Sequence, residues 1–241
     1  MLHNQIKYSL NPLYRKRGFL SKDQLTKPTL MFKITIQKER KTMYEAKKFN
    51  SIKQLDGISQ KTMEDHYKLY EGYVKKANEI EEKLKTVDKS TANQVYSDLR
   101  ELKLEYSFAV GGVKNHETYF GHLGGNGGEP TAALLQMIQR DFGSFDAWKE
   151  DLKQTGMAAR GWVWLAFDWN TNKLFNYLGD AQNTFPVWDA SVLLALDTYE
   201  HAYWADYGTA RATYIDAFFK NLDWKVVEEK FKAVGIDKFI Q

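Results

Sequence analysis

Hydrophobic residues between positions 59 and 108 recur at steps of three and four, the spacing of one buried helix face. Ser59 stands where a helix N-cap is expected, and the first apolar stripe then comprises Met63, Tyr67, Tyr70, Val74, Ala77 and Ile80. A second stripe follows Thr86 to about Phe108 and comprises Val95, Leu99, Leu102 and Tyr106. Two long helices joined by a short polar segment predict an antiparallel helical hairpin.

Glycines interrupt this helical pattern. The pair Gly111-Gly112 and the stretch from Gly121 to Pro130, which holds five glycines, are expected to break the chain and to mark a boundary. A phosphate-binding loop is disfavoured here, because no Lys-Ser or Lys-Thr pair follows and no predicted strand precedes. Helical patterns resume at about 130–141 and 144–158.

The following segment has the composition of β-strands. Residues 162–167 and 173–177 are rich in aromatic and β-branched side chains and flank the turn Asn170-Thr171-Asn172, which predicts a hairpin. Residues 191–196 form a short continuous apolar run suited to a buried third strand. Two or three amphipathic helices are expected to complete the chain.

This order of elements predicts an α+β fold, in which an N-terminal antiparallel helical hairpin is followed by a helical domain with a small three-stranded antiparallel sheet. We expect three parts along the chain: a basic N-terminal extension over residues 1–50, a helical hairpin domain over 51–125, and an α/β C-terminal domain over 126–241.

The composition narrows the possible chemistry. The 241 residues include no cysteine, which excludes disulfides, iron–sulfur clusters, thiolate zinc sites and cysteine nucleophiles. A hydrophobic content of 43% supports a folded core. No apolar run of about 18 residues is present, and the N-terminus lacks the apolar segment of a secretory signal. We therefore expect no membrane insertion, no secretion by a classical signal peptide, and a location in the cytoplasm or an organelle matrix.

Charge is distributed unevenly. Residues 1–50 hold 12 Lys and Arg against 3 Asp and Glu, a net +9, whereas the remainder holds 22 basic and 28 acidic residues, a net −6. The basic extension is interpreted either as a targeting, nucleic-acid or membrane-surface segment or as a solvated, frayed terminus. Because the remainder of the chain is acidic, we do not expect a nucleic-acid partner. Within the extension, residues 30–37 have the pattern of an edge strand.

Three of the five histidines stand in predicted structured segments: His66, His116 and His201. Asp197 and His201 are four residues apart, which on a helix places them about 40° from each other and on one face. Three imidazoles and one carboxylate suit iron, manganese or zinc. The alternative is that these are ordinary hydrogen-bonded or surface histidines, and spacing alone does not choose between the two.

Four stretches of the sequence resemble the iron/manganese superoxide dismutases, from about Ile58 to Trp224. They are Gly111-Gly-Val-Lys-Asn-His-Glu-Thr-Tyr-Phe120, Asn126-Gly-Gly-Glu-Pro-Thr through Arg140-Asp-Phe-Gly-Ser-Phe145, Gly161-Trp-Val-Trp-Leu165 and Asp197-Thr-Tyr-Glu-His-Ala-Tyr-Trp-Ala-Asp-Tyr207. The four occur in the family's order and with compatible spacing. The resemblance implies one iron or manganese ion per chain, with His66, His116, Asp197 and His201 as its protein ligands.

The resemblance leaves two candidates for the first metal ligand, His66 and Asp65. Tyr73 matches the family's gateway tyrosine but stands seven residues after His66, where the family has eight. One residue fewer rotates a side chain by about 100° on a regular helix, so we expect a bulge or shifted kink in this segment. If the family's spacing of eight residues is counted back from Tyr73, the ligand position falls on Asp65 instead. His66 is the preferred assignment.

The same resemblance implies the remaining site residues. Gln182 matches the glutamine that binds the metal-bound solvent in manganese-type members, and Gly112 is the small residue expected to leave room for it. This pair favours manganese or use of both metals. Tyr73, Gln182 and Trp162 are together predicted to be catalytic.

The implied reaction converts superoxide to dioxygen and hydrogen peroxide by cyclic one-electron transfer. The resemblance also implies a homodimer in which Glu200 bonds His201 of the opposite subunit.

The sequence departs from the family at Leu69, Trp204 and Tyr119-Phe120, which stand where the family has other residues surrounding the metal ligands. Two alternatives are a non-catalytic or altered-activity metal-binding relative on the same fold and another non-haem iron enzyme, which would usually have two His and one carboxylate.

Overall fold

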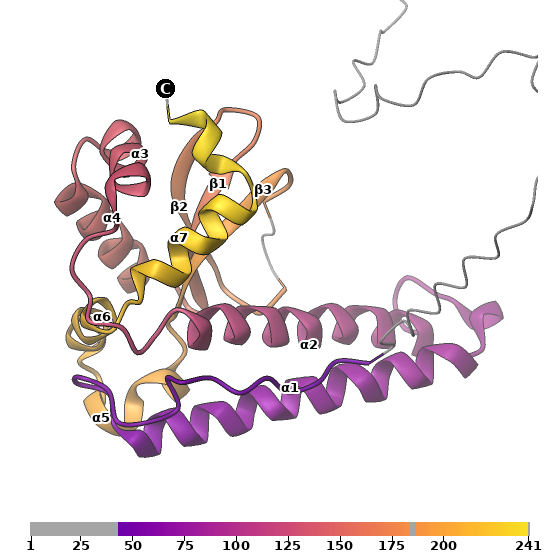
Figure 1. Cartoon of the computed structure of the whole chain (residues 1–241). Coiled ribbons are helices and arrows are strands. Elements are labelled where there is room, and N and C mark those ends of the chain that lie inside the picture. Colours follow the sequence, from indigo (N-terminus) through magenta and orange to yellow (C-terminus); the bar gives the residue numbers. More distant parts are fainter. Residues whose placement is uncertain (1–42, 184–186, 241) are drawn as a thin grey trace, which may run out of the picture. The chain divides into compact units, whose positions relative to one another are not determined.

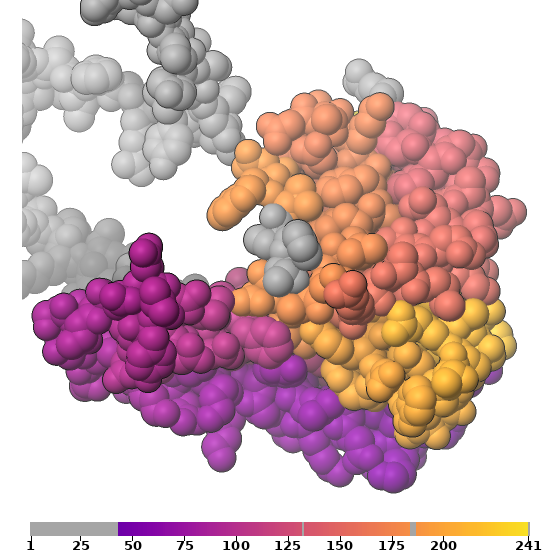
Figure 2. Space-filling view, turned by 180° about the vertical axis from the view of Figure 1, so that it is seen from behind, coloured from indigo at the N-terminus to yellow at the C-terminus, as the bar shows by residue number. Residues whose placement is uncertain are grey.

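The computed structural model describes residues 43–183 and 187–240, and this part of the chain begins with two antiparallel helices lying side by side (Figure 1). Helix α1 spans Gln60–Thr86 and α2 spans Asp98–Gly121, with the short 3₁₀ helix η2, Lys89–Thr91, between them. Figure 2 shows the far end of this pair projecting beyond the C-terminal elements. The predicted helical hairpin is confirmed.

Both long helices begin at a serine that caps them. Ser59 Oγ accepts a hydrogen bond from the Thr62 amide at 3.1 Å, and Ser97 Oγ accepts one from the Arg100 amide at 3.2 Å. Such caps satisfy amides that the first helical turn leaves unpaired. The buried face of α1 follows the predicted stripe and includes Met63, Tyr70, Val74, Ala77 and Ile80.

Helix α2 differs from its prediction at both ends. It begins at Asp98, well after the end of α1, and it continues through Gly111 and Gly112 to Gly121. A glycine inside a helix costs about 1 kcal/mol relative to alanine. Glycine is nevertheless required at position 111, because a Cβ there would lie 2.2 Å from the carbonyl oxygen of Gln182. The break predicted at Gly111-Gly112 is therefore wrong, since close packing requires glycine within the helix.

The second predicted break is confirmed. Between α2 and α3, Gly124, Gly127 and Gly128 adopt positive φ angles of 93°, 64° and 75°, a backbone region that side chains with a Cβ rarely enter. Helices α3, Ala132–Phe142, and α4, Phe145–Ala158, then follow close to their predicted positions.

The strands form one antiparallel sheet in the order β2-β1-β3. Strand β1 spans Trp162–Asp168, β2 spans Lys173–Gly179 and β3 spans Ala190–Asp197. In the register of β1 with β3, Trp162 lies opposite Asp197. The predicted three-stranded sheet and the α+β fold class are thus confirmed.

Helices cover the sheet and complete the core. Helix α3 packs against β2, α4 packs against β1 and β2, and α2 and α7 pack against β3 (Figure 1). The C-terminal elements are η3 Glu200–Ala202, α5 Trp204–Tyr207, α6 Arg211–Lys220, α7 Trp224–Ala233 and η4 Ile236–Phe239. Trp148, Trp162, Tyr119 and Tyr214 are fully buried in the core. The base of the hairpin therefore belongs to the same packed interior as the sheet.

Most of the predicted basic extension, including the strand suggested for residues 30–37, lies outside the described residues. The segment after residue 43 runs along α1: Tyr44 exchanges two hydrogen bonds with the Asn78 side chain, and the Lys47 amide donates to Tyr70 Oη at 2.9 Å. Sequence patterns did not predict this packing. Among the described residues, no helix combines the length and apolar character needed to cross a membrane.

Candidate metal centre

Four side chains predicted as ligands meet at the base of the hairpin. His66 comes from α1, His116 from α2, Asp197 from the end of β3 and His201 from η3, and their donor atoms all lie within 4.8 Å of one another. His66 Nε2 and His201 Nε2 each lie 3.1 Å from Asp197 Oδ2, and His116 Nε2 lies 3.7 Å from it. His201 retains 25% side-chain exposure and the other three have none.

Local backbone contacts aim these donors inward. His116 Nδ1 lies 2.7 Å from the Gly112 carbonyl oxygen, so Nδ1 carries the proton and donates it there. The lone pair of His116 Nε2 then faces the cluster, where this buried atom has no hydrogen-bond partner among the described residues. Asp197 Oδ1 accepts from the Tyr199 amide at 2.9 Å, which leaves Oδ2 turned toward the imidazoles.

Asp197 and His201 converge, although not on a shared α-helix as the spacing argument assumed. Asp197 ends β3 and His201 lies in a 3₁₀ turn. The chain reverses between them because the Thr198 amide donates to the Gly161 carbonyl at 2.8 Å and the Tyr199 amide folds back onto Asp197. The helical geometry predicted for this pair is wrong, and the turn brings the two side chains together instead.

The electrostatics of the cluster favour an ionised Asp197 beside neutral His66 and His116. Burial lowers the pKa of His201, but the Asp197 carboxylate outweighs it and raises that pKa, so His201 gives up a proton when it binds a metal. Burial lowers the pKa of His116 to about 3, with a further lowering from His66, and burial also lowers the pKa of His66. Burial would raise the pKa of Asp197, but His201 and His66 hold it below its usual range. Neutral imidazole nitrogens and an ionised carboxylate are the forms that bind a transition metal. The cluster therefore fits one such ion.

The alternative first ligand, Asp65, points away from the cluster. It is 50% exposed and forms ion pairs with Lys61 at 2.5 Å and Lys68 at 3.0 Å. His66 is buried and contacts Asp197 directly. The structure thus brings His66, and not Asp65, to the other three residues.

Tyr73 reaches the cluster without the expected bulge. Helix α1 is α-helical throughout, and a separation of seven residues returns Tyr73 to nearly the face of His66 two turns earlier. Its ring lies 5.4 Å from the His116 ring. A Cβ on Gly112 would lie 2.6 Å from the Tyr73 ring, so Gly112 makes room for this tyrosine. The prediction of a bulge is wrong, and the neighbour accommodated by Gly112 is Tyr73.

A hydrogen-bonded chain joins the other two predicted catalytic residues to Tyr73. Trp162 Nε1 donates to Gln182 Oε1 at 2.9 Å, and Gln182 Nε2 donates to Tyr73 Oη at 3.3 Å. Since an indole only donates, Trp162 fixes which end of the amide faces Tyr73. Gln182 is buried, with 4% exposure, and the Trp162 ring lies 5.1 Å from His116.

Two supporting residues were missed by the sequence analysis. Asn115 Nδ2 donates to the Gln182 carbonyl at 3.2 Å, and its Oδ1 accepts from Trp164 Nε1 at 3.2 Å. Tyr214 Oη donates to the Asp197 carbonyl at 2.8 Å, and its oxygen pairs with Tyr119 Oη at 3.0 Å. Asn115 directly precedes a predicted ligand, which was the available signal. Nothing in the sequence pattern indicated Tyr214.

His122 is the remaining described histidine, and it serves the core. It is 2% exposed, and its Nε2 accepts from the Ala195 amide at 3.1 Å. Burial lowers the pKa of His122 from 6.5 to about 3, with a further lowering from Lys230. The imidazole therefore stays neutral in the fold and takes up a proton only on unfolding.

Because of His122, we expect the free energy of unfolding to decrease as the pH falls. Its contribution to the free energy of unfolding is fully present above about pH 6.5 and is lost as the pH falls toward about 3. Between about pH 7.5 and 5 the loss of unfolding free energy is about 2 kcal/mol. Urea unfolding at both pH values, compared between wild type and His122→Gln, measures the difference. An equal loss of unfolding free energy in both proteins would contradict the assignment.

Comparison with known proteins matches both halves of this fold. The model of the iron/manganese superoxide dismutase α-hairpin domain matches residues 53–124, and that of the C-terminal domain matches residues 130–230. The chain is 47% identical to an iron superoxide dismutase of Aquifex pyrophilus over 183 residues, covering 74% of this chain and 86% of the relative. It is 40% identical to a manganese superoxide dismutase of Haloarcula marismortui over 122 residues, covering 50% and 60%.

Proposed function

Because the chain belongs to the iron/manganese superoxide dismutase family, we propose that His66, His116, Asp197 and His201 bind one manganese or iron ion and that the protein dismutates superoxide. The observation that carries the proposal is the convergence of four donors within 4.8 Å in a buried position. Two superoxide ions and two protons yield dioxygen and hydrogen peroxide. The complete donor set speaks against a non-catalytic relative and against a site with only two imidazoles.

The metal, when bound, supplies the one-electron oxidation and reduction, and the protein controls protons around it. Gln182 Nε2 donates to Tyr73 Oη, so the hydroxyl hydrogen of Tyr73 is free to point elsewhere. Tyr73 is therefore proposed as the gate and proton partner. Gln182 is proposed to bind the metal-bound solvent, and Trp162 to hold the amide in the orientation that both contacts need.

The experiment that tests the activity is metal analysis together with a superoxide-consumption assay on the purified chain. We expect about one manganese or iron per chain and activity that chelation removes and either metal restores. Gln182, which matches the glutamine of manganese-type members, favours manganese or use of both metals. A chain that binds no metal, or one that binds it and does not consume superoxide, would contradict the proposal.

Glu200 and His201 are proposed to form part of a homodimer interface. His201 is the one member of the cluster with an exposed side chain surface, and Glu200 beside it is exposed. Leu69 and Trp204 are also 44% and 50% exposed and offer apolar surface that a partner subunit could bury. A partner subunit would cover this surface and supply a carboxylate to orient His201.

We expect Glu200→Ala to shift the protein toward monomer and to speed metal loss, because His201 loses the group that orients it. Sedimentation velocity measures the first effect and metal release to a chelator the second. Glu229→Ala, an exposed glutamate on α7, is the matched control. A monomeric, fully active wild type would rule out this interface.

A location in the cytoplasm or an organelle matrix is proposed on the family's chemistry, and fractionation tests it.

A further inference from the structure

A cavity that contains none of the four clustered side chains adjoins the site, since Gln182 and Asn115 belong to its lining. It has a volume of about 940 Å³ and is lined by residues of α2, the sheet and α7, none of which belongs to the four-residue cluster. Its apolar walls include Val110, Val192, Leu193, Val226 and Val227. Pockets of this size and lining hold small organic molecules.

Lys230 lines this cavity and has no charged partner among the described residues. Lys230 of α7 is half-buried, and no hydrogen bond or ion pair of its ammonium occurs within residues 43–183 and 187–240. Burial lowers the pKa of Lys230 to about 8, so the ammonium is held in an unfavourable setting. A buried charge is ordinarily compensated by an opposite charge.

The rest of the described lining reinforces the positive charge. Lys114 and Lys47 also line the cavity, and Glu117 is the single acidic residue among the lining residues. Glu117 is already engaged by Lys47 in an ion pair. The cavity thus combines an excess of cationic groups with mainly apolar walls.

We propose that this cavity binds an amphipathic carboxylate, with its anionic head on the Lys230 ammonium and its hydrocarbon body along Val192 and Val226. The head supplies the charge that Lys230 lacks, in a charge-assisted hydrogen bond. The body removes apolar walls from water. One half-buried cation matches a monoanion with an apolar chain. This binding goes beyond superoxide chemistry and requires no metal, so it can be measured without dismutase turnover.

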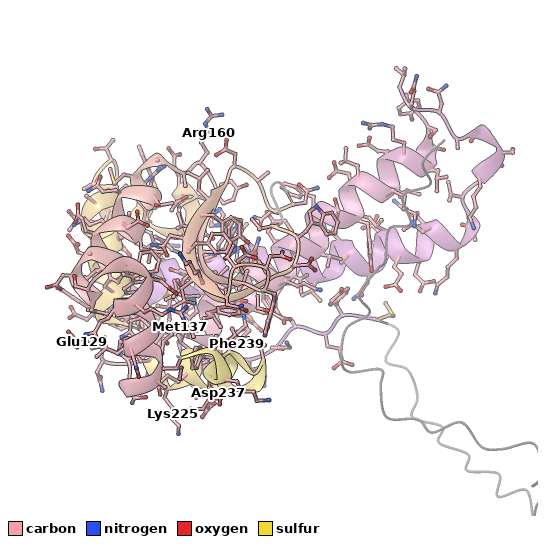
Figure 3. All side chains as sticks on the ribbon, turned by 90° about the horizontal axis from the view of Figure 1, so that it is seen from above. Glu129, Met137, Arg160, Lys225, Asp237 and Phe239 are labelled. Atoms are coloured by element: carbon pink, nitrogen blue, oxygen red, sulfur yellow. The ribbon has the colours of Figure 1, made fainter. Side chains whose placement is uncertain are left out.

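Isothermal titration calorimetry of the purified full chain with dodecanoate, and separately with 1-dodecanol, tests the proposal. We expect the wild type to bind dodecanoate more tightly than the uncharged alcohol. Lys230→Gln should weaken dodecanoate binding by about tenfold or more, since a charge-assisted hydrogen bond is lost, and should leave dodecanol binding unchanged. Lys225→Gln is the matched control, because Lys225 is an exposed lysine of the same helix outside the lining (Figure 3).

Val226→Trp fills the cavity from α7 and should abolish binding of both ligands while the thermal unfolding transition is retained. This variant keeps the test decisive if Lys230→Gln folds poorly. The proposal is overturned if the wild type binds no dodecanoate, if Lys230→Gln binds it as tightly as wild type, or if Val226→Trp still binds it.

Discussion

Asp197→Ala is expected to bind no metal and to lose essentially all dismutase activity. Asp197 is the only carboxylate in the cluster of four, and its Oδ2 lies 3.1 Å from both His66 Nε2 and His201 Nε2. Removing it takes away the one anionic donor and leaves imidazoles facing an empty space. Metal content of the purified variant, followed by superoxide consumption, measures the result.

Asp197→Asn and His122→Gln separate metal binding from folding. Asn keeps the size of the side chain and the bond from the Tyr199 amide but removes the charge, so we expect it too to lose metal. His122 is buried like the ligands but lies outside the cluster, so its variant should keep metal. His116→Ala should behave as Asp197→Ala. Wild-type metal loading in both His116→Ala and Asp197→Ala would refute the ligand assignment.

Gln182→Ala is expected to keep its metal and to lower turnover by about 10–100-fold, the usual cost of losing a group that tunes a metal site. The amide connects Trp162 Nε1 at 2.9 Å with Tyr73 Oη at 3.3 Å, and the ligands remain in place without it. The redox potential of the bound metal should shift. Pulse-radiolysis turnover and a potentiometric titration measure the two effects.

Neighbouring variants test whether the amide itself is responsible. Asn183→Ala changes the next residue, whose side chain donates to Ser107 Oγ and does not contact the cluster. It should leave turnover unchanged. Tyr73→Phe should alter the pH profile of turnover more than metal content, since it removes the hydroxyl and keeps the ring against Gly112. If Gln182→Ala turned over superoxide at the wild-type rate and potential, the proposed role would be abandoned.

Local chemistry along the chain was enough to predict the order of the main helices and strands, although not the bounds of α2, and to supply candidate donors. The three- and four-residue spacing located the buried face of α1, and Ser59 located its start, because both depend only on helical geometry within a few residues. The absence of cysteine restricted a metal to imidazole and carboxylate ligands. His66, His116, Asp197 and His201 were therefore predictable as a set from sequence and resemblance.

Tertiary structure alone decided how these residues meet. His66 and Asp197 are 131 positions apart, and packing of α1 against α2 and η3, and of α2 against β3, brings them to 3.1 Å, which no local period specifies. The same packing keeps Gly112 inside a helix, since only the missing Cβ admits the Tyr73 ring. Tyr214 supports Asp197 through a backbone carbonyl that sequence does not distinguish. Helical propensity acts over neighbouring residues, whereas close approach between distant segments depends on the assembled core.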